Sequence, residues 1–88
     1  MEPYRVPFLF DRTNAPRYRL VNIGAERVTG ISVTLLGSGA MAALEPAGLE
    51  PTEALELVIH GDDLARDSVL VVRWLRPSGE DWLWRVAF

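Results

Sequence analysis

Short runs of alternating apolar and polar residues, each bounded by turn residues, constrain the fold of this chain more than any other feature. Alternation with a period of two puts the apolar side chains on one face of a β-strand, so each run predicts a half-buried strand. The turn signals recur about every eight to twelve residues, a spacing typical of a sandwich or barrel. We therefore predict an all-β protein that folds as an antiparallel β-sandwich of six to seven strands.

Five strands are predicted at residues 17–21, 28–36, 54–60, 68–76 and 81–88, and a short strand is favoured over a helical turn at 40–44. One face of each long strand is apolar, and these faces pack together in a sandwich. The predicted core consists of Tyr18, Leu20, Ile31, Val33, Leu35, Leu55, Leu57, Ile59, Leu70, Val72, Trp74, Trp84 and Val86.

Residues 1–16 contain three of the six prolines, which lack an amide donor and disfavour a central strand. We predict an extended N-terminal arm over residues 1–16 and a sandwich domain over residues 17–88. Apolar residues alternate within the arm, so one of its faces can lie along a sheet edge of its own domain or against a neighbouring chain. The residues predicted for interaction come from this face of the arm and from the outer side of the strand at 68–76. They are Tyr4, Val6, Phe8, Phe10, Val69, Val71 and Arg73.

Composition argues against several classes of function. The net charge of −3 disfavours general nucleic-acid binding, which needs an excess of cations, so we expect no nucleic-acid partner. The longest uncharged stretch, residues 28–44, is too short and too rich in glycine to insert into a membrane. The absence of cysteine excludes thiol chemistry and favours a reducing compartment, which predicts a cytoplasmic location. All nine basic residues are arginine, which is typical of a GC-rich bacterial genome.

Two stretches carry a resemblance to a known type of domain. Residues 20–35 contain an Asn-Ile-Gly turn between two alternating runs, and residues 49–55 read Leu-Glu-Pro-Thr-Glu-Ala-Leu. Both resemble bacterial immunoglobulin-like domains, such as the adhesion-related modules found in tandem on bacterial surface proteins. Those domains often have Pro-Gly-Glu or Pro-Gly-Asp where this chain has Thr52 after proline. The resemblance implies an immunoglobulin-like β-sandwich without a catalytic site that acts as a spacer, adhesion or binding module.

Few residues could support catalysis or metal binding. His60 is the single histidine, and the aspartates that follow it match neither a calcium loop nor a zinc site. Glutamates at 45, 50, 53 and 56 do not by themselves define a glycosidase pair. We therefore expect no enzymatic activity, no catalytic residue, no bound metal and no cofactor. The polar residues weighed for a metal-dependent site are His60, Asp62, Asp63 and Asp67.

Trp82 and Trp84 are two residues apart and share one face of the last strand. If they point outward beside Arg73 or Arg85, they form an aromatic and cationic platform that stacks sugar rings or anchors a partner. An inward position is favoured.

The main prediction is a non-catalytic protein-interaction or structural module with a protein partner, or a homodimer formed by arm exchange or edge pairing. The alternative is a carbohydrate-binding module that uses Trp82 and Trp84.

Overall fold

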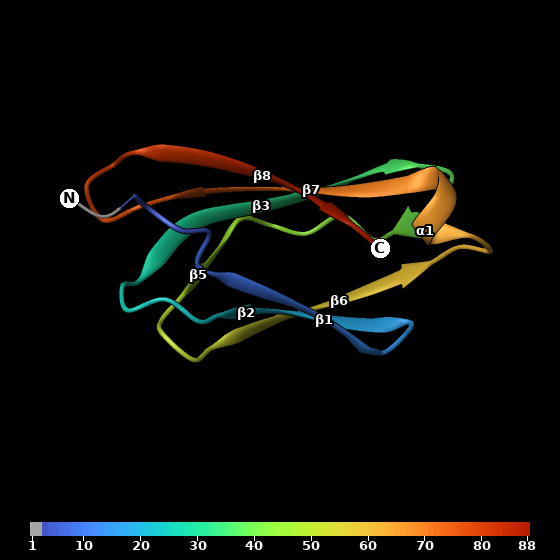
Figure 1. Cartoon of the computed structure of the whole chain (residues 1–88), viewed down its shortest axis with the longest axis horizontal. Helices are drawn as coiled ribbons and strands as arrows, with labels where there is room; N and C mark the ends of the chain where they lie inside the picture. Colours follow the sequence, from blue (N-terminus) through green and yellow to red (C-terminus); the bar gives the residue numbers. More distant parts are fainter. Residues whose placement is uncertain (1–2) are drawn as a thin grey trace.

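Eight β-strands form two four-stranded antiparallel sheets that pack face to face in the computed structural model, which describes residues 3–88 (Figure 1). One sheet has the order β1-β2-β6-β4 and the other has the order β5-β3-β7-β8. The prediction of an all-β sandwich is therefore confirmed. The elements are β1 (Phe8–Asn14), β2 (Arg17–Asn22), β3 (Val28–Gly37), β4 (Ala40–Met41), β5 (Ala47–Leu49), β6 (Ala54–His60), α1 (Leu64–Asp67), β7 (Ser68–Leu75) and β8 (Asp81–Ala87).

The long strands other than β1 lie where alternation predicts them, whereas some of the short elements have no clear signal in the sequence. The six strands β1, β2, β3, β6, β7 and β8 have at least six residues each. The other two, β4 and β5, have two and three residues. The strand β5 lies between Pro46 and Pro51, and α1 is a single helical turn directly before β7.

Residues 8–14 of the predicted arm form β1, an edge strand that pairs antiparallel with β2. The side chains of Phe8 and Phe10 point between the sheets and are 5% and 4% exposed. Their place in the predicted interaction surface is therefore corrected: both belong to the core, because edge pairing with β2 turns their face inward. The first two residues of the predicted arm lie outside the described residues.

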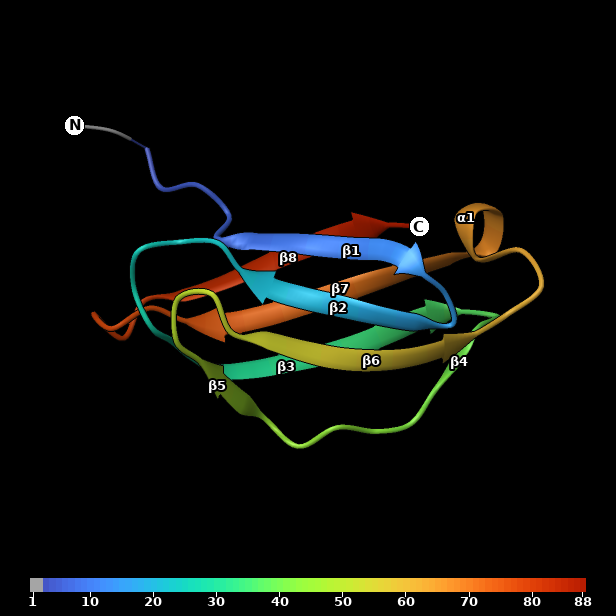
Figure 2. The same cartoon turned by 90° about the horizontal axis from the view of Figure 1, so that it is seen from below.

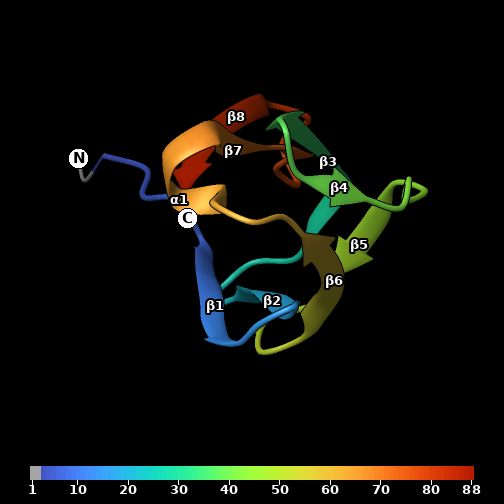
Figure 3. The ribbon, with the colours of Figure 1, turned by 90° about the vertical axis from the view of Figure 1, so that its right-hand side faces the viewer.

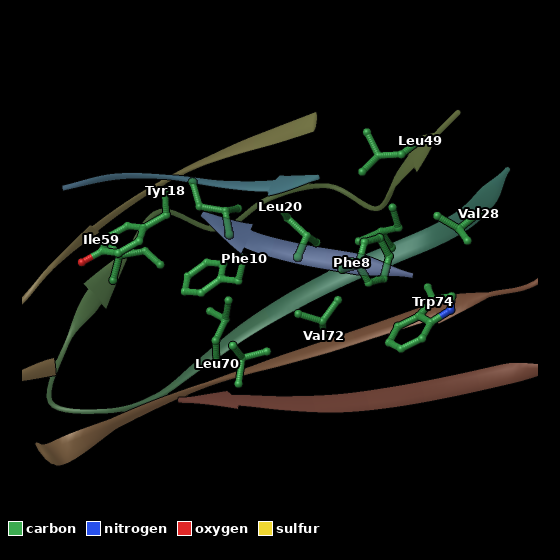
Figure 4. Close-up of a cluster of buried hydrophobic side chains, with 13 residues drawn as sticks. Phe8, Phe10, Tyr18, Leu20, Val28, Leu49, Ile59, Leu70, Val72 and Trp74 are labelled. Carbon is green, nitrogen blue, oxygen red and sulfur yellow. The ribbon is translucent and has the colours of Figure 1, made fainter. Parts of the chain in front are cut away.

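Thirteen apolar side chains form one buried cluster between the sheets (Figure 4). Trp74 is its largest fully buried member, and Phe8 packs edge-to-face against it with ring centroids 4.9 Å apart. Nine predicted core residues are buried; the other four, Val33, Leu35, Leu55 and Trp84, are partly buried against the cluster. The buried residues not predicted from alternation are Phe8, Phe10, Val28 and Leu49.

A β-bulge in β3 explains why Val28 is buried. The pairing of β3 with β7 shifts register between Thr29 and Ser32, and Gly30 inside this shift has a φ of +58°. The extra residue reverses the alternation of side chains along the strand. Val28 and Ile31, three residues apart, therefore both face inward, at 0% and 1% exposure.

Asn22 is the one buried polar side chain among the described residues, and all of its polar atoms are hydrogen-bonded. Its Nδ2 donates to the carbonyl oxygens of Glu26 (3.0 Å) and Leu49 (3.1 Å), and its Oδ1 accepts from the Gly24 amide (2.9 Å). Its backbone amide donates to the Glu53 carbonyl at 2.9 Å. Asn22 therefore ties the β2–β3 turn to residues 49–53, which are distant in sequence.

Thr52, the residue that stands where the resembled domains have glycine, has a φ of 74°. Left-handed backbone is unfavourable for a β-branched residue and costs about 1–3 kcal/mol. We expect Thr52→Gly to raise the free energy of unfolding by about 1 kcal/mol, because the relief of strain exceeds the entropy lost by glycine. Urea unfolding would show a higher midpoint with an unchanged m-value. Thr52→Ala keeps a Cβ and should gain less; an alanine variant more stable than the glycine variant would contradict this explanation.

The two sides of the sandwich differ in how they are closed. Figure 3 shows β4 and β5 on one side and β1 on the opposite side. On the β1 side, Nη1 of Arg12 donates to the Phe10 carbonyl at 3.2 Å and Nη2 donates to the Ala87 carbonyl. The Phe88 ring packs edge-to-face on Phe10 and Tyr18 at 5.7 and 5.6 Å. Arg12 and Phe88 therefore connect the edge strands β1 and β8, which belong to different sheets.

Candidate functional site

The outer face of the β5-β3-β7-β8 sheet carries a continuous apolar patch. Cross-strand pairing places Leu36, Val69 and Ala87 in one row, and Val71 lies in the next row between Thr34 and Arg85. Val69 and Val71 alternate along β7 with the buried residues Leu70 and Val72, so they point away from the core. We call the following residues the valine face: Leu36, Val69, Val71 and Ala87, bordered by Arg73 and Arg85.

The outer face of the other sheet has apolar residues too, but a row of charges divides them. Leu9 pairs with Val21 in one row, at one end of this face. The adjacent outward row consists of Asp11, Arg19 and Glu56. Val58, which is 43% exposed, lies beyond this row. On the valine face the charged residues Arg73 and Arg85 stand at the border and form no row between Val69 and Val71.

The two arginines that border the valine face differ in their electrostatics. Nε of Arg73 donates to both carboxylate oxygens of Asp81, at 3.0 and 3.1 Å. These hydrogen bonds lower the pKa of Asp81 from its ordinary value and raise that of Arg73. Within residues 3–88 Arg85 forms no ion pair. Arg85 therefore gives this border a positive charge available to an acidic group of a partner.

A shallow hollow of about 360 Å³ adjoins the patch where β7 begins. Leu36, Val69 and Arg85 form part of its wall, and Arg66 and Asp67 of the short helix form another part. The combination of an apolar centre and an arginine border is typical of protein-binding sites.

The remaining predicted surface residues lie elsewhere, at the N-terminal end of β1. Tyr4 is half-buried: its ring centroid is 4.6 Å from that of Trp82, and its hydroxyl accepts a hydrogen bond from Trp74 Nε1 at 3.0 Å. Val6 is exposed and lines a groove of about 780 Å³ with Ile23 and Arg76. Tyr4 and Val6 therefore precede β1, whereas Val69, Val71 and Arg73 lie on β7. The interaction role of these residues stays a prediction.

Trp82 and Trp84 lie on the inner face of β8 and are partly buried against the core. Tyr4 packs against Trp82, and the Phe8 ring lies parallel to Trp84 with centroids 6.5 Å apart. Their inward placement is therefore confirmed. The Nε1 of Trp82 is buried and has no hydrogen-bond partner among the described residues.

The polar residues weighed for a metal-dependent site do not gather into one. Exposed His60 ends β6, and Asp62 and Asp63 follow it in the connection to the short helix. Asp67 accepts a hydrogen bond from the Ser68 hydroxyl at 3.1 Å. Within residues 3–88, no group of three or more histidine and carboxylate side chains is placed to hold a metal ion.

Sequence reasoning found the β7 part of the valine face and missed Leu36, Ala87 and Arg85. Leu36, Ala87 and Arg85 lie beside Val69 and Val71 only because β3 and β8 pair with β7 in the observed register. Knowledge of that register would have identified them. Alternation alone shows which face a residue occupies and not which residues stand beside it.

Comparison with known proteins finds no matching family model and no significant match among curated proteins or solved structures. Within the described residues, no helix has the length and apolar character needed to cross a membrane.

Proposed function

We propose that this chain is a non-catalytic protein-interaction module that binds its partner through the valine face. The observation that carries this proposal is the continuous apolar patch on β3, β7 and β8, with a hollow beside it and arginines at its border. Apolar surface that is left contiguous on a small domain is a common mark of an interaction site. The partner's complementary surface is an apolar group flanked by carboxylates, which pair with Arg85.

We also propose that the sandwich is immunoglobulin-like. In such folds of seven strands, A to G, strands A, B and E share one sheet and strands C, F and G share the other. Here β1-β2-β6 and β3-β7-β8 have this arrangement when the six long strands are considered. The short strands extend this frame at the edges, with β4 beside β6 and β5 beside β3.

Nothing in the arrangement of the tryptophans favours the alternative of a carbohydrate-binding module. Sugar rings stack on exposed aromatic faces, whereas Trp82 and Trp84 point into the sandwich and contact Tyr4 and Phe8. The interaction module therefore remains the single functional proposal.

The test is affinity capture from a lysate of the source organism with the full chain, followed by mass spectrometry. A protein enriched by the wild-type chain should be lost with the double variant Val69→Asp and Val71→Asp, because a buried unpaired carboxylate is strongly unfavourable at an interface. Val58→Asp places the same change on the opposite sheet and should leave capture intact. Circular dichroism confirms that each variant is folded.

Equal capture by the double variant and the wild-type chain would refute binding at the valine face. Loss of capture by the Val58→Asp variant alone would move the site to the other sheet. In either case the surface assignment fails even if a partner is found.

A further inference from the structure

The strand β8 is the one long, regular edge strand in the described part of the chain. At the other edges, β4 and β5 have two and three residues, and β1 has a register shift between Asp11 and Asn14. The pairing of β8 with β7 runs without a shift from Asp81 to Ala87. It contains neither proline nor glycine. A free edge of this kind is a template for pairing with another strand.

The orientation of the Ala87 carbonyl shows which backbone N–H and C=O groups of β8 point away from β7. This carbonyl accepts a hydrogen bond from Arg12, so it points away from β7. Peptide groups alternate in direction along a strand, so those of Arg85, Leu83 and Asp81 also point to the free edge. Arg12 occupies the end of this edge at Ala87, and within residues 3–88 no element other than β7 forms a hydrogen bond with the backbone of residues 81–85.

The side chains of this segment are self-complementary about Leu83. When two copies of β8 pair antiparallel with Leu83 opposite Leu83, each Asp81 stands opposite Arg85 of the other copy and also keeps its ion pair with Arg73 of its own chain. The peptide groups that point to the free edge then face one another, as an antiparallel ladder requires. Opposite charges and apolar side chains directly across a sheet are both stabilising. A register centred on Arg85 instead places two arginines against each other.

We propose that a second copy of this chain pairs with β8 in the register centred on Leu83, which joins the two sheets into one continuous eight-stranded sheet. Leu83 is 59% exposed in the single chain, and this pairing gives it an apolar neighbour. The twofold axis is perpendicular to the sheet, so both valine faces lie on the same side of the dimer. Figure 2 shows that the described residues before β1 continue away from the start of that strand. Dimerisation uses the edge of β8 and shares only Arg85 with the valine face, so failure of one proposal leaves the other standing.

A charge exchange tests this register with two single variants. Arg85→Asp and Asp81→Arg each place like charges opposite one another twice, so each should weaken dimerisation about tenfold or more. Mixing the two variants restores both Asp–Arg pairs and should give a one-to-one heterodimer. Sedimentation velocity is expected to show twice the 9.8 kDa mass for the wild-type chain and for the mixture. A monomeric wild-type chain, or a mixture no more associated than its components, overturns the proposal.

A cysteine scan provides a second test, because the chain contains no cysteine. In this register the Cα atoms of residue 83 lie about 5.5 Å apart across the axis, within disulfide range. The two copies of residue 85 lie about 13 Å apart at the strand rise per residue. Leu83→Cys should therefore form a disulfide-linked dimer under mild oxidation, and Arg85→Cys should not. Equal cross-linking of both variants, or none with Leu83→Cys, overturns this register, while capture by the valine face is measured separately.

Discussion

Asn22→Ala is expected to lower the free energy of unfolding by about 3 kcal/mol, although the substitution is far from the valine face. The variant loses three side-chain hydrogen bonds and leaves the carbonyls of Leu49 and Glu26 and the amide of Gly24 without their partner. Each polar group left buried and unpaired costs about 1–3 kcal/mol, and partial access to water at Glu26 and Gly24 reduces the sum. Chemical denaturation monitored by tryptophan fluorescence measures the change.

Two further variants separate the hydrogen bonds from general effects of substitution. Asn22→Asp should be at least as destabilising, because its carboxylate faces two carbonyl oxygens where the Nδ2 group donated. Asn14→Ala makes the same change at an exposed strand position and should stay within about 0.5 kcal/mol of the wild-type chain. If Asn22→Ala unfolded at the same midpoint as the wild-type chain, the hydrogen bonds of Asn22 would not be what holds the β2–β3 turn to residues 49–53.

Trp74→Ala is expected to cost about 3–5 kcal/mol, the range for removing a large aromatic side chain from a core. Trp74 is 0% exposed, packs edge-to-face with Phe8 and donates to the Tyr4 hydroxyl. The alanine variant therefore leaves a cavity and releases the segment before β1. A loss of this size is a large part of the stability of a small domain, so this variant should be largely unfolded at modest urea concentrations.

A more conservative variant keeps the test informative when the alanine variant does not fold. Trp74→Phe retains an aromatic ring against Phe8 but loses the hydrogen bond to Tyr4, and we expect a cost of about 1–2 kcal/mol. Leu9→Ala, at a 54% exposed position, serves as the control. If the phenylalanine and alanine variants were equally stable, packing around Trp74 would not limit the stability of the domain.

Alternation identified most of the structure because each half-buried strand leaves a direct periodic signal. It placed β6 at its observed limits and Trp74 in the core. It failed for Val28, where the bulge at Gly30 reverses the period, and for Leu49, whose strand has three residues. The prolines of residues 1–16 predict an extended arm with Phe8 on its interaction face, whereas pairing of β1 with β2 buries Phe8.

The candidate site was less predictable than the fold, because it depends on which strands are neighbours. Val69 and Val71 were expected to point outward from alternation along one strand. To predict that Leu36 belongs to the valine face, the β3–β7 register must be known. To predict that Arg85 borders this face, the β7–β8 register must be known. The β3–β7 register depends on tertiary contacts and on the bulge in β3, which have no short-range sequence signal, whereas the β7–β8 register is set by the turn between the two strands.

The most direct test of the valine face is a methyl NMR spectrum of the wild-type chain, recorded with and without the protein recovered by affinity capture. Binding at this face should shift the methyl signals of Leu36, Val69 and Val71 and leave those of Leu9 and Val58 on the opposite sheet unchanged. Shifts confined to Leu9 and Val58 would contradict the account, because they would place the partner on the sheet whose apolar residues are divided by charges.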